Sequence, residues 1–108
     1  MENKPICEID SMGTKRWYLN GCLHREDGPA VEMADGTKCW YLNGNYHRLD
    51  GPAIVDMRDS ENYGLWYING NDITRKIIQW AKEHDIDLEN LTDVDKALIK
   101  ITWADYGK

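Results

Sequence analysis

The sequence predicts an α+β protein in which an antiparallel β meander of about six strands, built from three hairpin repeats, precedes two C-terminal α-helices. Three observations predict this class. The motif Trp-Tyr-Leu-Asn-Gly starts at Trp17 and at Trp40, and Trp-Tyr-Ile-Asn-Gly starts at Trp66. Apolar and polar residues alternate in each copy, and an Asn-Gly pair ends it. After Gly70 the alternation changes to apolar residues at helical spacing.

The repeat extends beyond the tryptophan motif. The stretches WYLNGCLHREDGPA and WYLNGNYHRLDGPA differ at only three positions. Pro5, Pro29 and Pro52 each lead a further short segment ahead of a tryptophan. We therefore expect three strand pairs, which cover residues 5–20, 29–43 and 52–69. The third pair should have a longer turn, at residues 56–64.

Each tryptophan segment is typical of a half-buried strand. Successive side chains of a strand point to opposite faces, so Trp17 and Leu19 would share one face, and Arg16 and Tyr18 the other. The Asn-Gly pairs predict type I′ turns, since both residues tolerate positive φ. One hairpin buries too little surface to be stable, so the hairpins should stack side by side with the tryptophans on one face.

The first predicted helix follows the last hairpin. Asp72 or Thr74 would be its N-cap. The residues at helical spacing that would form its buried stripe are Ile73, Ile77, Trp80, Ala81 and His84.

The second predicted helix begins after Thr92, its expected N-cap, and Asp93 and Asp95 favour its N-terminal dipole. Its expected buried stripe consists of Val94, Ala97, Leu98 and Ile101. A further apolar stripe consists of Ile99, Trp103 and Tyr106. Together the two stripes are wider than one buried face requires.

The two parts should pack as one domain, with residues 1–71 as the repeat sheet and 72–108 as the two-helix element. An apolar sheet face must be covered, so the helices are expected to cover the tryptophans. The alternative is that the helices project and form a dimer contact or dock a partner.

The repeat resembles MORN-type repeats, which are short β-hairpin units rich in aromatic residues and Asn-Gly or Asp-Gly pairs. It resembles more closely the WYLNGxxHRxDGPA repeats of small proteins from tailed bacteriophages and large DNA viruses. The match covers residues 5–74 and departs from the standard MORN unit in its His-Arg-x-Asp-Gly-Pro segment. The resemblance implies a viral origin, assigns no activity, and carries over no lipid or scaffold role.

Charge and cysteine content narrow the class of protein. The 108 residues carry a formal net charge of −6, which argues against direct nucleic-acid binding and suits a basic protein partner. Three cysteines without a Cys-x-x-Cys pair, and a start without a signal-peptide pattern, predict reduced thiols and a cytoplasmic location in the host cell. No apolar stretch is long enough to span a membrane.

The repeated His-Arg-x-Asp-Gly-Pro segment could suggest a catalytic loop. A general base would need a nucleophile nearby, and the only serines are Ser11 and Ser60, both in predicted turns. We expect a structural corner, in which Asp accepts hydrogen bonds and His bridges neighbouring corners. In the alternative, a nucleotide would bind at these corners; the residues would be His24, Arg25, His47 and Arg48.

Neither metal pattern in the sequence is complete. Cys22 and His24 could face Cys39 and His47, but the second repeat has Asn45 where the first has Cys22. The stretch from Asp85 resembles a calcium loop but has Asn and Lys at its sixth and twelfth positions. We expect no metal and no cofactor.

Two groups of residues are candidates for binding a partner. The first is a tyrosine ladder on the sheet face opposite the tryptophans, formed by Tyr18, Tyr41 and Tyr67. The second is acidic and consists of Asp85, Asp87, Glu89, Asp93 and Asp95. We expect a non-enzymatic phage accessory protein, monomer or homodimer, that binds and inhibits or modulates a bacterial host protein, possibly one of a defence system of the CRISPR or restriction type. The alternative is a nucleotide-binding or nucleotide-sequestering protein.

Overall fold

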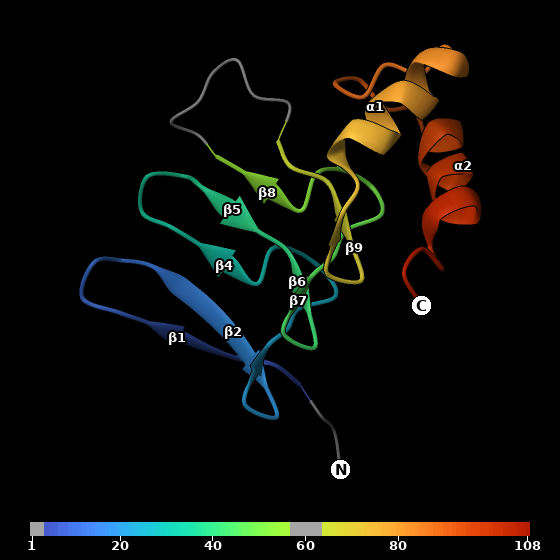
Figure 1. Cartoon of the computed structure of the whole chain (residues 1–108). Helices are drawn as coiled ribbons and strands as arrows, with labels where there is room; N and C mark the ends of the chain where they lie inside the picture. The colour runs from blue at the N-terminus through green and yellow to red at the C-terminus, as the bar shows by residue number, and fades with distance from the viewer. Residues whose placement is uncertain (1–3, 57–63) are drawn as a thin grey trace.

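The computed structural model describes residues 4–56 and 64–108 and confirms the predicted α+β class (Figure 1). The expected turn at residues 56–64 lies largely outside the described residues, as does Ser60. Within them, the elements are β1 (Ile6–Ile9), β2 (Lys15–Leu19), β3 (Cys22–Leu23), β4 (Val31–Glu32), β5 (Lys38–Cys39), β6 (Tyr41–Leu42), β7 (Asn45–Tyr46), β8 (Ile54–Val55), β9 (Tyr67–Ile68), β10 (Asn71–Asp72), α1 (Thr74–Glu83) and α2 (Asp93–Trp103).

The main sheet is an antiparallel meander in the order β1-β2-β4-β5-β8, and β3 pairs with β2. Two small hairpins, β6–β7 and β9–β10, stand beside it. The predicted tight turns are present, because Asn20, Asn43 and Asn69 each have φ of 51° and a glycine with positive φ follows each of them.

The sequence pattern suggested a continuous strand around the middle tryptophan, but the structure has two short strands there. The break is at Trp40, between β5 and β6. The Trp40 N–H donates to the Ala53 carbonyl of the next unit, while its carbonyl accepts from His47 of its own hairpin. The backbone of Trp40 is thus the point where the chain leaves the main sheet and enters the small hairpin.

The core lies at the C-terminal end of the stack. Its fully buried side chains are Trp66, Ile68, Ile73, Ile77 and Ile99. The expectation that the helices cover all three tryptophans is wrong: both helices lie beside β9 (Figure 1), and Trp17 and Trp40 stay half-buried. The helix α1 follows the third hairpin directly, and helices of 10 and 11 residues are too short to reach along the whole stack.

The buried face of α2 also differs from the prediction. Val94, Ala97, Leu98 and Ile101 are exposed, and the second stripe, with Ile99 fully buried, faces the core. The aromatic residues decide this orientation, because large rings bury more apolar surface than Val or Leu. Trp103 packs edge-on against Trp80 of α1, with ring centroids 6.1 Å apart.

The N-cap prediction for α1 is wrong, because Ile73 and not Asp72 or Thr74 is the N-cap, and no side chain caps it. Of the predicted stripe, Ile77 and Ala81 are buried, whereas His84, just after α1, is exposed. Thr92 caps α2 through a capping box in which its hydroxyl accepts from the Asp95 N–H and the Asp95 carboxylate accepts from the Thr92 N–H.

Candidate functional site

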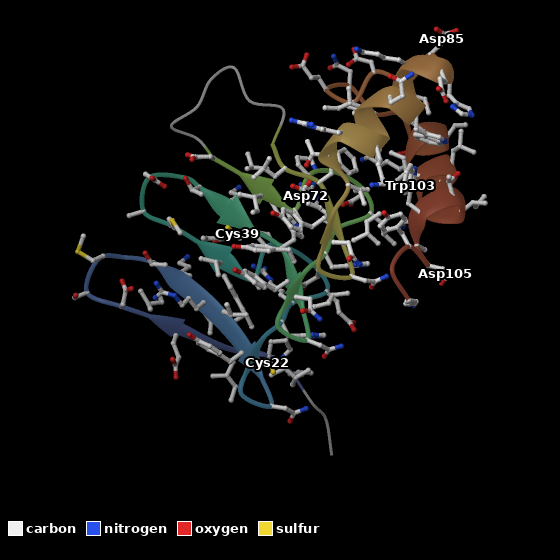
Figure 2. All side chains as sticks on the ribbon, viewed as in Figure 1. Cys22, Cys39, Asp72, Asp85, Trp103 and Asp105 are labelled. Atoms are coloured by element: carbon white, nitrogen blue, oxygen red, sulfur yellow. The ribbon has the colours of Figure 1, made fainter. Side chains whose placement is uncertain are left out.

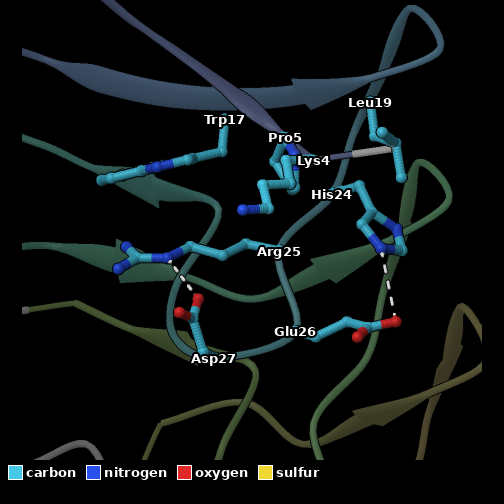
Figure 3. A pocket seen from close by; sticks show the side chains of 8 residues that line it. All are labelled: Lys4, Pro5, Trp17, Leu19, His24, Arg25, Glu26 and Asp27. Atoms are coloured by element: carbon cyan, nitrogen blue, oxygen red, sulfur yellow. Dashed lines mark hydrogen bonds and ion pairs between the residues drawn. The ribbon is translucent and has the colours of Figure 1, made fainter. Parts of the chain in front are cut away.

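The first repeated corner is built around the side chain of Arg25 (Figure 3). Its guanidinium carbon lies 3.9 Å from the centroid of the Trp17 ring. Nε donates to Asp27 Oδ1 at 2.9 Å, and Nη1 donates to the Pro29 carbonyl at 3.1 Å. The arginine therefore joins the tryptophan strand to the end of its own corner, and the aspartate accepts the hydrogen bond that the sequence analysis expected.

The second corner repeats this arrangement around Arg48. Its guanidinium carbon is 3.7 Å from the Trp40 ring centroid, Nε donates to Asp50 at 2.8 Å, and Nη1 donates to the Pro52 carbonyl at 3.0 Å. Burial by itself would raise the pKa of Asp50, but the hydrogen bond and the positive charge of Arg48 hold the pKa below its ordinary value.

Space explains the glycine of the motif. A Cβ added to Gly51 would lie 2.6 Å from the guanidinium carbon of Arg48. At Gly28 the same atom would lie 3.1 Å from that of Arg25. Each guanidinium is therefore held between a tryptophan ring and a glycine, and any larger residue would displace it.

The histidines link each corner to the next repeat. His24 Nδ1 accepts from the Asn43 N–H at 2.9 Å, and His47 Nδ1 accepts from the Asn69 N–H at 2.9 Å. In parallel, the Arg25 N–H donates to the Tyr41 carbonyl at 3.1 Å. The histidines were expected to bridge neighbouring corners; each instead links its corner to the Asn-Gly turn of the following hairpin.

The third unit has a helix in place of this corner. Ile73 stands where the earlier units have histidine, and it is buried in the core. Thr74 stands in place of arginine, and its Oγ1 accepts from the Trp66 N–H at 2.9 Å. The Asp72 carboxylate accepts from both the N–H and the hydroxyl of Thr74, so it binds the first residue of α1.

The corners border two open hollows of about 500 and 540 Å³. His24 and Arg25 line the first, whereas Arg25, His47 and Arg48 line the second, so the four residues of the nucleotide alternative do not form one site. In the first corner, the polar groups that face His24 Nε2 and the Arg25 fork are carboxylates and a carbonyl of the chain itself, from Glu26, Asp27, Glu32 and Pro29. Ser11 lies in the turn between β1 and β2.

The tyrosine ladder differs from the predicted set. Tyr41 and Tyr46 stack with ring centroids 4.4 Å apart, and Tyr67 lies 5.0 Å from Tyr46. Tyr18 instead pairs with Leu23, the equivalent of Tyr46 in the first hairpin. Burial and a hydrogen bond with Tyr46 raise the pKa of Tyr41. The prediction missed Tyr46. The two-residue Asn43-Gly44 turn places Tyr46 opposite Tyr41, so the sequence pattern could have indicated it.

The acidic candidates Asp85, Asp87 and Glu89 occupy the connector between the helices. Figure 2 shows Asp85 at the tip of the helical part. Asp87 has a local role, since its carboxylate accepts from the Glu89 N–H and from the Asn90 side chain. These two bonds lower the pKa of Asp87, the Asn90 bond more strongly. Asp85 has a φ of 55° and is exposed.

An open, mostly apolar hollow of about 370 Å³, which the sequence did not predict, lies between α1 and the connector. Apolar side chains from α1 and the connector line it, and Lys82, Asp87 and Glu89 stand at its border; the apolar lining residues are Ile78, Ala81, Ile86 and Leu88. The alternation of Asp and apolar residues from Asp85 to Glu89 could have indicated it. Asp93 and Asp95 lie apart from this hollow, in the first turn of α2.

No metal site or membrane span appears in the part of the chain that the structure describes. Within residues 4–56 and 64–108, no group of three or more His, Cys, Asp or Glu side chains could hold a metal ion. Cys22 is exposed and Cys39 is buried in the sheet (Figure 2). Neither α1 nor α2 has the length and apolar character needed to cross a bilayer.

The sequence and the fold were compared with those of known proteins. No protein-family model matches the chain, and no curated protein or solved structure is significantly similar to it.

Proposed function

We propose that this chain is a non-enzymatic binding protein, a small phage accessory protein that docks a basic surface of a bacterial host protein and thereby inhibits or modulates it. The observation that carries the proposal is the hollow between α1 and the connector, where apolar side chains meet the Asp87 and Glu89 carboxylates. Asp85 is an exposed residue of the same connector. The resemblance of the repeat to those of phage and viral proteins supports the host assignment, including a partner from a defence system.

The chemistry of the hollow suits a protein side chain. Ile86 and Leu88 offer apolar contact to an anchor residue, and pockets that take such anchors are where binding energy concentrates. Glu89 at the border would pair with a Lys or Arg beside that anchor. The net charge of −6 would steer a basic partner toward the protein.

Internal hydrogen bonding makes the corners poor candidates for an active site. The Nε and Nη1 donors of both arginines are already used within the chain, and their faces are covered by tryptophan. A phosphate would have to compete with Asp27 and Asp50 for these groups. The nucleotide alternative therefore ranks second, and a melting-temperature increase with any member of a nucleotide panel, abolished by Arg48→Lys, would favour it.

Capture of host proteins from a bacterial lysate tests the proposal. Wild-type protein should enrich a small set of basic proteins, and Glu89→Lys and Asp85→Asn should weaken binding of the purified partner by about tenfold or more. Asn suits the positive φ of residue 85, so this change removes charge without backbone strain.

Glu8→Lys is the matched control. Glu8 is an exposed acidic residue of β1, in the first hairpin, away from the helices (Figure 1). This variant changes the net charge as much as Glu89→Lys does and should bind normally. The proposal would be wrong if no host protein were enriched, or if Glu89→Lys bound as well as Glu8→Lys.

A further inference from the structure

The apolar stripe of α2 that the sequence predicted to be buried is covered by no part of the described chain. Val94, Leu98 and Ile101 are 77%, 37% and 82% exposed. They recur at i, i+4 and i+7, so they form one stripe along two turns of the helix, with Ala97 beside them. Ile99, on the opposite side, is fully buried. An exposed apolar stripe of this kind marks a contact surface.

One border of this stripe carries opposite charges. Asp93 and Lys100 are seven residues apart and therefore lie on the same flank of the helix, about 10.5 Å apart along its axis. Both are exposed, and neither forms an ion pair with another residue of the described chain. Asp93 is in the first turn and Lys100 in the last.

We propose that the α2 stripe is the contact of a homodimer, in which two copies of α2 pack antiparallel about a two-fold axis near Ala97. A two-fold contact brings the same surface of both chains together and must be complementary to itself. Here Val94 of each chain meets Ile101 of the other, and Asp93 of each chain lies opposite Lys100 of the other. The charge pairing between Asp93 and Lys100 thus occurs twice, once on each side of the two-fold axis, and an apolar stripe alone would not need it.

The charges also select the antiparallel direction. Side by side in parallel, the two helices would place their acidic first turns, with Asp93 and Asp95, against each other. The antiparallel direction instead sets each acidic turn beside the basic last turn of the other copy. The small side chain of Ala97 at the centre allows the helices to approach closely.

The size of the contact predicts a reversible dimer. Two helical turns bury less surface than the roughly 1,200–2,000 Å² of a stable specific interface. The dimer should therefore dissociate on dilution and form at high micromolar concentration. The stripe does not include the hollow lined by Ile86 and Leu88, so this inference stands or falls independently of the proposed partner.

Sedimentation equilibrium of the full chain over a concentration series, from about 10 μM to 1 mM, tests the inference. Wild-type protein should show a monomer–dimer equilibrium, and Ile101→Asp should remain monomeric. Asp93→Lys and Lys100→Asp should each raise the dimer dissociation constant by about tenfold or more, because each places like charges together. The double variant Asp93→Lys/Lys100→Asp should restore dimerisation.

The charge swap separates contact from folding. Each single change also opposes the helix dipole, and those losses add in the double variant, so restored dimerisation reports the intermolecular pair alone. Glu89→Lys, which changes the hollow, should dimerise like wild type. Wild-type protein that is monomeric at 1 mM, or a double variant no better than the single ones, would overturn the inference.

Discussion

The guanidinium of Arg48 lies flat against Trp40, with 3.7 Å between its central carbon and the ring centroid, and Arg25 repeats this contact on Trp17. Of the three tryptophans of the repeat, the chain thus covers Trp17 and Trp40 with its own arginines and buries Trp66 in the core beside the helices. Each arginine is fixed by an aspartate and a proline carbonyl within the same corner. The hydrogen bonds of the repeated arginines are therefore made to the chain itself.

The orientation of α2 predicts opposite outcomes for two neighbouring isoleucines. Ile99→Ala should lower the free energy of unfolding by about 2–5 kcal/mol, because it opens a cavity in the core. Ile101→Ala should change it by less than about 0.5 kcal/mol, because this side chain is on the surface of the monomer. Urea denaturation at low protein concentration measures both. Equal losses would contradict this orientation of α2.

The third Asn-Gly turn forms hydrogen bonds to the end of the helical part that the first turn does not form. The Asn69 amide donates to the Ala104 and Tyr106 carbonyls, at 3.2 and 2.9 Å, and so ties the end of α2 to the hairpin. Asn69→Gly keeps the positive φ but loses these bonds and should cost about 1–2 kcal/mol. Asn20→Gly, at the same turn position with an exposed side chain, should be nearly neutral. Chemical denaturation compares the pair, and similar values for both would contradict the tether.

Acidification should lower the stability of the link between the second corner and the third hairpin, because His47 forms that link. Burial, and then the positive charge of Lys108, lower the pKa of His47. The unfolded chain therefore takes up the proton first as the pH falls through about 6.5, and the unfolding free energy should decrease between pH 7.5 and 5.5. A proton on Nδ1 would also remove the acceptor of the Asn69 N–H.

His47→Gln provides the comparison for this pH dependence. The variant lacks the titrating group and should lose less stability than wild type over the same pH interval. Urea midpoints measured at several pH values give the two slopes. Identical slopes would show that the His47 bond to Asn69 does not control stability in this range.

The repeat was the most predictable part of the fold. Asn20 and Gly21 encode a turn by their own backbone preferences, and alternation encodes the strands, so local information was sufficient. The face of α2 was not predictable locally. Val94 and Ile99 are both apolar, and only the position of Trp80 on a neighbouring helix decides which side packs inward.

The candidate site was predictable only in part. The acidic connector was found from composition, but the hollow beside it depends on how Ile86 folds back against α1, which spacing does not encode. The role of Gly51 was missed as well. Its φ is not the reason for glycine there; the reason is the guanidinium of Arg48, placed against it by contacts with Trp40.

The central claim is that His-Arg-x-Asp-Gly-Pro is a structural joint, and the unfolding free energy of Arg48→Lys tests it most directly. Lysine keeps the charge but lacks the planar fork that stacks on Trp40 and bonds Asp50 and the Pro52 carbonyl. We predict a loss of about 1–3 kcal/mol in urea denaturation, against less than about 0.5 kcal/mol for the control Arg75→Lys on the exposed face of α1. An Arg48→Lys variant as stable as wild type would contradict the claim.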